Sequence, residues 1–452
     1  MGPELVAILA LVVLFVIGTL LPINMGALAY VAAWLVGMYS LGLDEKEILG
    51  GISADLVLTL IGVTYLFAIA RQNGTVDLIV RRAVELARGR VWLIPWVMFA
   101  VTAVITAIGA ASPAACAIIG PIALGFAGRY GISPLMMGMF VVHGAQAGGF
   151  SPISIYGTIT NSVMEDAGLG DSPLTLFFSS LAVNTVMALI LFVVLGGRKL
   201  MTLRLDGDGE LVAVGDGPGA ARAAGGTTRR DRSTAQSGTG ATPTTGTPDT
   251  EHLGNTREHV LTLLAFVAVA TVALAFDKNI GFAAITAAVL LSILSPNAYK
   301  DTVKQIAWPT VLLVAGVSTY AAILTTAESP EYVGTWAAGL GAAAVGALIL
   351  CYVGGVVSAF ASSTALLPVI IPIAVPLMSE GGLSVGLFVA ALAVSSTIVD
   401  VSPFSTNGAL MLANRPDSVS EPVYYKQILT YGVIVTLVGP LLVWAALVLP
   451  GW

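Results

Sequence analysis

The sequence predicts an all-α membrane protein with many spans, built from two copies of one unit. Its 452 residues are 56% hydrophobic and only 10% charged, whereas a soluble domain carries about a quarter charged residues. Apolar segments long enough to enter a bilayer follow one another through most of the chain. Short motifs also recur at a fixed distance, which indicates an internal repeat.

The repeat is clearest at serine- and proline-containing breaks in apolar sequence. The run Ser-Pro-Ile-Ser at 151–154 recurs as Ser-Pro-Phe-Ser at 402–405, and Pro121 recurs at the same offset as Pro372. Chance alignment of apolar sequence does not explain matching proline and serine positions. We therefore predict a first repeat over residues 1–197, a disordered cytoplasmic linker over 198–257 and a second repeat over 258–452.

Each repeat is predicted to hold five full spans and one re-entrant hairpin, with a broken helix at the bilayer midplane. The fourth and fifth apolar segments of each half are joined by almost nothing, and the fifth is short for a span. Two full spans with a turn at the surface are the alternative. The segments lie at about 4–22, 26–42, 52–70, 92–110, 113–128, 134–163 and 174–196, then at 258–276, 280–295, 308–325, 335–360, 363–378, 383–412 and 424–449.

Charge placement predicts the orientation. Of the 20 Lys and Arg residues, only Lys46 and Lys278 fall on the side that carries most loop acids. Positive charge marks the cytoplasmic side, so both termini are expected outside, in the inner (plasma) membrane. Five spans per repeat is an odd number, so the second copy is expected to be inverted, a common plan of secondary transporters.

The candidate site is where the four polar breaks meet: two hairpin tips and two unwound helices. Irregular backbone at membrane depth is tolerated only around a protein-lined cavity. Amides at helix N-termini attract anions, and freed carbonyl groups coordinate cations. No Lys or Arg lies deep inside a span. An anionic substrate would therefore depend on hydroxyl groups, helix N-termini and co-bound cations, which favours cation coupling.

Asp400 is the one acid placed well inside a predicted span. Intramembrane carboxylates are costly and usually functional, so Asp400 is a candidate Na⁺ ligand or proton carrier. The alternative is a structural carboxylate that caps the following half-helix. Its counterpart in the first repeat is Gly149, so the site is not symmetric. His143, before the first break, is either a proton relay or a hydrogen-bonded core residue.

These breaks resemble the paired signatures of the divalent anion/sodium symporter family of the ion transporter superfamily, closest to bacterial malonate/dicarboxylate carriers. Residues 111–113 (Ala-Ser-Pro) and 362–364 (Ser-Ser-Thr) stand where the family has Ser-Asn-Thr tips. The Ser-Pro pairs at 151 and 402 stand where it has Thr-Pro motifs. The resemblance implies a homodimeric elevator that holds a dicarboxylate at the tips and Na⁺ at each tip with the nearby unwound helix.

Two sets of candidate residues follow. Ser405, Thr406 and Asn407 are included because they are polar and follow the second break, without support from the family. The substrate-binding candidates are Ser112, Pro113, Ser151, Pro152, Ser362, Ser363, Thr364, Ser402, Pro403, Ser405, Thr406 and Asn407; the cation-binding candidates are Ser112, Gly148, Gly149, Ser363 and Asp400.

The departures from the family pattern matter for coupling. Neither tip has Asn, and Pro113 offers neither an amide donor nor a side-chain ligand. This puts the first Na⁺ site in question, and an intact cation site is expected beside Ser402-Pro403, with Asp400.

The sequence thus predicts a secondary transporter of small dicarboxylates, of the malonate, succinate or malate type, coupled to Na⁺ or H⁺. The alternative is a cation/proton antiporter or an inorganic oxyanion carrier of the same superfamily. An enzyme is not expected, since the chain has three His and no HExxH or GxSxG motif. No cofactor other than Na⁺ as a coupling ion and no nucleic-acid partner are expected.

Overall fold

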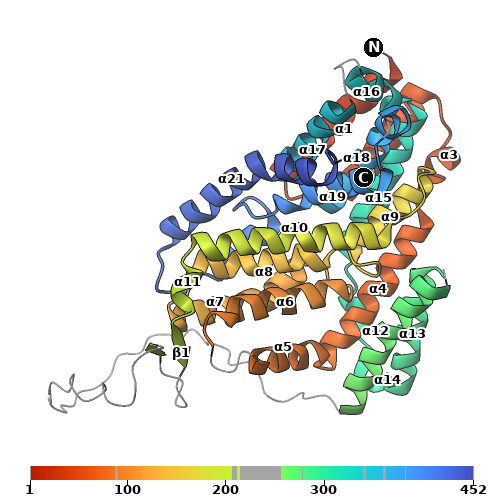
Figure 1. The fold of residues 1–452 in the computed structure, drawn as a ribbon. Coiled ribbons are helices and arrows are strands. Elements are labelled where there is room, and N and C mark those ends of the chain that lie inside the picture. The colour runs from red at the N-terminus through yellow and green to blue at the C-terminus, as the bar shows by residue number, and fades with distance from the viewer. Residues whose placement is uncertain are drawn as a thin grey trace, which may run out of the picture.

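The structure, a computed structural model, describes residues 2–86, 90–205, 211–213, 256–276, 278–338, 343–359, 363–381 and 383–450. Helices make up almost all of it (Figure 1). The elements are α1 (Pro3–Leu20), α2 (Met25–Val36), η1 (Gly37–Leu41), α3 (Glu45–Leu49), α4 (Ala54–Gln72), α5 (Thr75–Leu86), α6 (Leu93–Ala107), α7 (Ser112–Tyr130), α8 (Pro134–Gly148), α9 (Ile155–Asp166), α10 (Pro173–Val194), α11 (Gly197–Leu200), β1 (Leu203–Leu205), β2 (Leu211–Ala213), α12 (Thr256–Phe276), α13 (Ile280–Leu294), α14 (Pro296–Tyr299), η2 (Thr302–Gln305), α15 (Trp308–Thr326), α16 (Ser329–Ala338), α17 (Ala343–Ser358), α18 (Ser363–Gly381), α19 (Val385–Ile398), α20 (Thr406–Ala413) and α21 (Glu421–Leu447).

The helices confirm the predicted all-α membrane fold. Within the described residues, seven are long and apolar enough to cross a membrane: α1, the stretch Glu45–Gln72, α7, α10, α12, α15 and α21. One predicted segment, 335–360, begins at the wrong place. Its first residues belong to the end of α16, and the apolar helix that follows, α17, begins only at Ala343. Sequence reasoning also missed α5, a short amphipathic helix with Arg81 and Arg82 exposed.

Both predicted broken helices are present. α8 ends at Gly148 and its continuation α9 begins at Ile155, while α19 ends at Ile398 and α20 begins at Thr406. α6 and α7 pack against each other as a hairpin, and so do α17 and α18. Ser112 and Ser363, which begin the second helix of each hairpin, are only 5% and 3% exposed. The two tips are therefore inside the protein, as expected of re-entrant hairpins.

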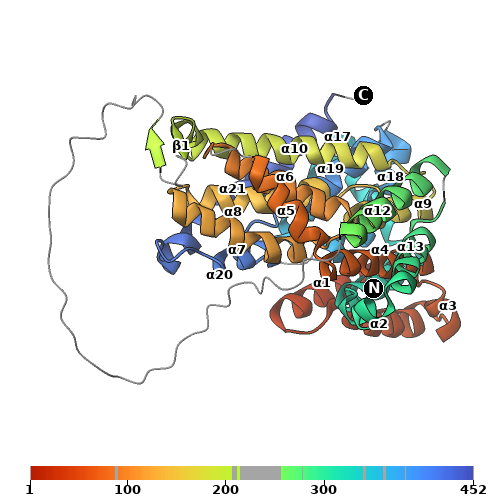
Figure 2. The ribbon, with the colours of Figure 1, turned by 90° about the horizontal axis from the view of Figure 1, so that it is seen from below.

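The helices fall into two groups that lie side by side. Figure 2 shows α2, α3 and α13 at one end of the molecule and α7, α8 and α20 towards the other. In the first group, α4 packs on α13 and α15 packs on α2. In the second group, α8 packs between α6 and α10, and α19 between α17 and α21. We call the first group the scaffold; it also includes α12, which packs on α13. We call the second group the hairpin bundle; it also includes α7, α9, α18 and α20.

The scaffold joins the two halves of the chain reciprocally. A Cβ atom on Gly26 of α2 would overlap the backbone of α15, and one on Gly316 of α15 would overlap Gly26. Gly62 of α4 and Gly281 of α13 form the matching close approach. In the hairpin bundle the Gln146 amide donates to the carbonyl of Thr397, 251 positions later, at 2.7 Å. Such contacts suit two copies related by a twofold axis, and the inverted relation stays a prediction.

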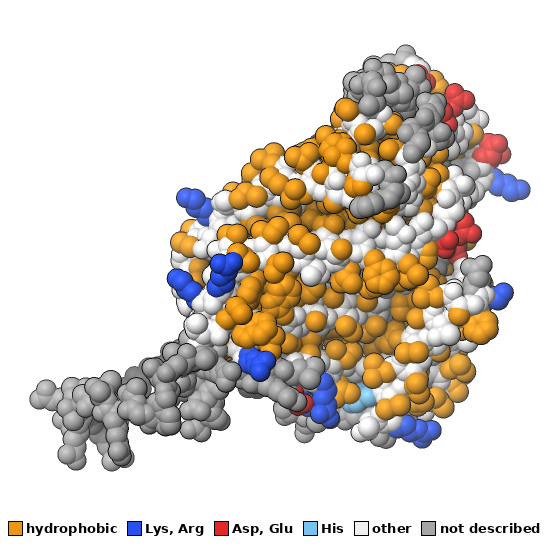
Figure 3. Space-filling model, in the orientation of Figure 1, with side chains coloured by type: hydrophobic (Ala, Val, Ile, Leu, Met, Phe, Trp, Pro, Cys, Tyr) orange, Lys and Arg blue, Asp and Glu red, His pale blue; other side chains and the backbone are white. Residues whose placement is uncertain are grey.

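Charged side chains gather at opposite ends of the molecule. Figure 3 shows acidic groups mainly at the end where α3, α9 and α16 meet, and most basic groups at the other. Apolar side chains cover the zone between them. The predicted linker begins with α11 and an antiparallel pairing of β1 with β2. Of the rest of it, 206–210 and 214–255 lie outside the described residues, and the last two residues, 256 and 257, already belong to α12.

Candidate carrier site

A cavity of about 410 Å³ lies where the four polar breaks meet. It is lined by the first residues of four helices: Ser112–Ala114 of α7, Ile155 and Tyr156 of α9, Ser363 and Thr364 of α18, and Thr406 of α20. The free amides at a helix start carry partial positive charge and bind anions. The described lining residues include no Lys, Arg or His. We call this space the carrier cavity; helix starts provide its positive potential.

The two Ser-Pro breaks are built alike. The Ser151 hydroxyl donates to the carbonyl of Ala107 at 2.5 Å, and the Ser402 hydroxyl donates to that of Ala359 at 3.2 Å. Each bond ties an unwound segment to the end of the first helix of its own hairpin. Three residues later, Ser154 and Ser405 donate to the carbonyls of Ser151 and Ser402, at 2.8 and 2.7 Å. These four serines stabilise the unwound segments through hydrogen bonds to backbone carbonyls, and none of them lines the carrier cavity.

Asp400 lies on the wall of the carrier cavity and is tied to the opposite half of the chain. The Asn407 amide donates to the Asp400 carboxylate at 2.7 Å and to the Ser112 hydroxyl at 2.8 Å. Ser112 is the tip of the first hairpin, so the carboxylate of the second repeat is connected to the first. We expected Asp400 to act with the second break, Ser402-Pro403. The structure adds that Asn407 links Asp400 to Ser112 at the tip of the first hairpin.

The same group of atoms offers oxygen ligands to a cation. Asn407 is fully buried, and its Oδ1 atom has no hydrogen-bond partner among the described residues. The Asp400 carboxylate and the Ser112 hydroxyl accept hydrogen bonds from the Nδ2 atom of this amide, not from the Oδ1 side. A carboxylate, an amide oxygen and a hydroxyl are hard ligands of the kind that alkali cations take. Asp400 and Ser112, both expected as cation ligands, thus offer oxygen atoms of this kind on the wall of the carrier cavity.

The tip of the second hairpin is less free to bind a cation. The Ser363 hydroxyl is 2.7 Å from that of Ser358 and donates to the carbonyl of Ser396 at 3.2 Å. Across the cavity, the Tyr156 side chain lines the same space as Ser363 and Thr364 and lies close to both of them. Tyr156 stands 251 positions before Asn407, so each half sends one side chain to the other half's tip.

The structure places the predicted site residues in three groups. Those that line the carrier cavity are Ser112, Pro113, Gly149, Ser363, Thr364, Asp400 and Thr406. Those that do not line it are Gly148, Ser151, Pro152, Ser402, Pro403, Ser405 and Asn407, although Asn407 bonds two residues that do. Ser362 lies outside the described residues.

Sequence reasoning missed one wall of the cavity. It comes from the scaffold, where the Asn24 amide donates to the carbonyl of Pro309 at 3.1 Å and both residues line the cavity. No pattern in the sequence brings 24 and 309 together. Tyr156 was also missed, although its place directly after the first break was a usable signal.

His143 is a core residue of the hairpin bundle. It is fully buried and does not line the carrier cavity. Its Nδ1 atom is 2.9 Å from Asn184 Oδ1, and its Nε2 atom is 2.6 Å from the Tyr431 hydroxyl. Because the Asn184 amide donates to Ser180, Asn184 offers an acceptor, which assigns the proton to Nδ1. A neutral ring with both nitrogens bonded ties α8 to α10 and α21.

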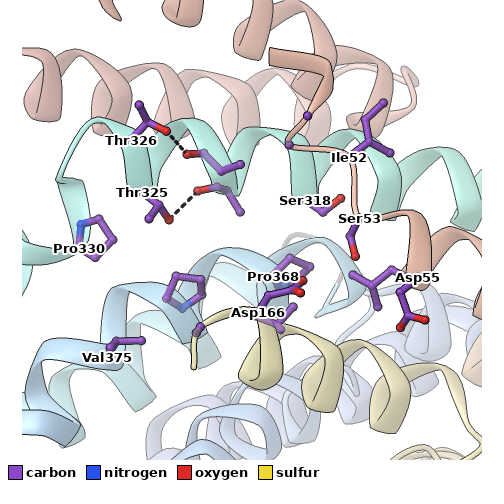
Figure 4. Close-up of a pocket in the computed structure, with 18 of the residues that line it drawn as sticks. Ile52, Ser53, Asp55, Asp166, Ser318, Thr325, Thr326, Pro330, Pro368 and Val375 are labelled. Atoms are coloured by element: carbon purple, nitrogen blue, oxygen red, sulfur yellow. Dashed lines mark hydrogen bonds between the residues drawn. The ribbon is translucent and has the colours of Figure 1, made fainter. Parts of the chain in front are cut away.

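A larger cavity, about 740 Å³, lies between scaffold and hairpin bundle at the acidic end. Figure 4 shows Ser318, Thr325 and Thr326 of α15 on one wall and Pro368 and Val375 of α18 on the facing wall. It shares no lining residue with the carrier cavity. We call it the outer cavity.

Comparisons with known proteins agree with this geometry. Residues 1–149 match the family model of the dicarboxylate carrier protein MatC N-terminus, and residues 276–451 match that of the citrate transporter. The fold is similar to the crystal structure of the Alcanivorax borkumensis YdaH transporter, described as having an unusual topology, at TM-score 0.57 and 13% identity over 98% of both chains. No curated protein sequence matches the chain significantly.

Each of the two family matches covers less than half of the chain, and both are to carriers of carboxylate anions, as the resemblance noted in the sequence leads one to expect. The chain is a multi-pass membrane protein that is similar to such transporters in both halves.

Proposed function

We propose that the protein is a secondary active transporter of small dicarboxylates, coupled to Na⁺ or H⁺. The observation that carries this proposal is the convergence of four helix starts on one cavity. Two hairpin tips lie in one space, and so provide two places for two carboxylate groups. The volume of about 410 Å³ suits a small ligand better than a large one.

Coupling follows from Asp400. A carboxylate on the cavity wall repels a dianion in the same small space, where no fixed positive charge compensates. A proton or Na⁺ on Asp400 removes that repulsion, so anion and cation bind together. A cation/proton antiporter would need the carboxylate but not four converging helix starts, which favours the anion carrier.

The transport cycle is proposed to be an elevator, with the hairpin bundle moving against the scaffold. The carrier cavity touches the scaffold at Asn24 and Pro309, near the basic end that carries Lys300 and Lys304. If basic residues mark the cytoplasm, the site faces inward and both termini are outside. The proposed protein is a homodimer of the plasma membrane, with inverted repeats over 1–197 and 258–452 and a connector between them.

Uptake into proteoliposomes tests this function. The purified chain is reconstituted, and uptake of labelled malonate, succinate and malate is followed with an inward Na⁺ gradient, an inward H⁺ gradient or neither. We expect one gradient to drive accumulation of at least one of them, with competition from the other dicarboxylates. Absence of gradient-driven uptake of all three, alongside transport of an inorganic oxyanion or cation exchange, would overturn the proposal.

A further inference from the structure

A third cavity runs from the acidic end of the molecule to the first break. This groove, about 470 Å³, lies between α9 and α10 of the hairpin bundle and α4, α12 and α13 of the scaffold. Its mouth carries Asp55 and Asp166, which also line the outer cavity, and its lining reaches Pro152. It shares no lining residue with the carrier cavity. We call it the outer groove.

Two facing helices place oxygen atoms along the outer groove at two levels. Asp55 and Thr59 are one turn apart on α4, and Thr158 and Ser162 are one turn apart on α9. At the upper level the Ser162 hydroxyl donates to Asp55 at 3.1 Å, and the Asn279 amide also donates to that carboxylate. At the lower level Thr59 and Thr158 are 2% and 4% exposed. The groove is thus an oxygen-lined passage leading inward from an acid.

Thr158 points to a ligand in this passage. Helical threonines usually return their hydroxyl to a carbonyl one turn earlier, as Thr102 does to Met98 at 2.7 Å. Thr158 lines the groove, and its buried hydroxyl has no hydrogen-bond partner among the described residues. A buried unpaired hydroxyl is costly, so a group inside the groove is needed to satisfy it.

The donor set favours a monovalent cation. Of the four residues at the two levels, Asp55 is the one with a carboxylate, and the other three offer hydroxyl oxygens. Across the described residues no group of three or more His, Cys, Asp or Glu converges, whereas sites for Ca²⁺ or transition metals usually combine several charged ligands. Burial raises the pKa of the nearby Asp166 carboxyl above its usual value, and the charge of Asp55 adds to this. Glu165, Asp166 and Asp171 line the groove together with Asp55, against one basic residue, Lys278, so acidic groups outnumber basic ones there.

We propose that the outer groove binds a monovalent cation, Na⁺, between Asp55, Thr59, Thr158 and Ser162, apart from the carrier cavity. The assignment of this ion to the transport cycle, as one that reaches the first break from outside, rests on the proposed function. The binding itself does not, because it depends only on the groove.

Melting of the purified full-length protein measures the binding directly. The shift in melting temperature is recorded as NaCl replaces choline chloride at constant ionic strength, in an Asp400→Asn background that removes the carboxylate of the carrier cavity. We expect Na⁺ to stabilise this protein. Asp55→Asn should raise the half-saturating Na⁺ concentration about tenfold or more, as loss of a charged ligand does. Thr158→Val, which keeps the side-chain shape, should raise it by a smaller factor.

Matched variants separate this site from general effects. Glu45→Gln removes an exposed acid at the same end that does not line the groove, and Thr185→Val removes a hydroxyl that bonds within α10. Both should keep the Na⁺ shift. An unchanged Na⁺ shift in both Asp55→Asn and Thr158→Val, or no shift when NaCl replaces choline chloride, overturns the groove site. Uptake measured separately decides the proposed function, so either idea can fail alone.

Discussion

The two halves of the chain place equivalent helix starts around the carrier cavity but differ in the side chains that they present to it. Ser112 and Ser363 begin equivalent helices at the tips, and both line the cavity. At the breaks the first half has Gly149 where the second has Asp400. The helix starts need repetition because they must converge, whereas one carboxylate is sufficient for a single coupling charge.

The contacts across the cavity show the same division. Asn407 of the second half bonds the tip of the first, whereas Tyr156 of the first half lies close to the tip of the second. Asn407 also bonds Asp400, while Tyr156 stands next to a glycine position without charge. Under the proposed function, both halves hold the substrate, and coupling depends on the second half and on its link to Ser112.

The largest expected effect is that of Asp400→Asn. The amide keeps an acceptor for Asn407 but removes the charge that a proton or Na⁺ neutralises. Gradient-driven accumulation of dicarboxylate should fall to background, while exchange of substrate without a gradient persists. Uptake and counterflow in proteoliposomes measure the two. Asp417→Asn, an exposed acid of the same half, should transport normally; full coupling in Asp400→Asn would contradict the role of this half.

Asn407→Ala comes next. It removes both amide hydrogen bonds and separates Asp400 from Ser112. Hydrogen bonds to a charged group are worth about 1.5–3 kcal/mol, so the apparent affinity for the coupling ion should fall roughly 10- to 100-fold. Uptake titrated with Na⁺, or with H⁺, provides the number. Asn414→Ala, whose amide bonds only within its own helix region, is the control, and an equal loss there would argue for a structural effect.

Gly149→Ala tests whether the first half has room for a side chain. A Cβ there would lie 2.8 Å from the ring of Tyr156, which would push that ring towards the cavity. Overpacking costs about 1–3 kcal/mol, so substrate affinity should fall about tenfold. Binding of a dicarboxylate by calorimetry is the measurement. Gly125→Ala, where a Cβ meets open space, should bind as the unmodified protein does; unchanged binding in Gly149→Ala would refute the steric argument.

The smallest expected effect is that of Tyr156→Phe. It keeps the ring but removes the hydroxyl that lies close to the second tip, a polar group whose interactions are worth about 0.5–1.5 kcal/mol. Substrate affinity should fall roughly 2- to 10-fold with coupling retained, in contrast to the Asn407 variant. Half-saturation of uptake, compared with Tyr130→Phe at the far end of α7, provides the measurement. Loss of coupling in Tyr156→Phe would mean that the two halves are more alike than proposed.

The amino-acid sequence by itself determined the helices, the breaks and the hairpins. These features are local: apolar runs fix the length of a span, and the Ser-Pro pairs at 151 and 402 stand where each of the two helices is interrupted. Matching residues at a constant offset also located both tips and both unwound segments. Seven of the predicted site residues consequently line the carrier cavity.

The tertiary structure alone decided which breaks contact one another and what the remaining walls are. Asn407 and Ser112 are 295 positions apart, and Asn24 and Pro309 are 285 apart. Local patterns do not specify such pairs, since they result from how the scaffold and the hairpin bundle pack. The serines of the breaks show the same limit: sequence marked Ser151 and Ser402 as polar, and only the fold shows that their hydroxyls bond the hairpins.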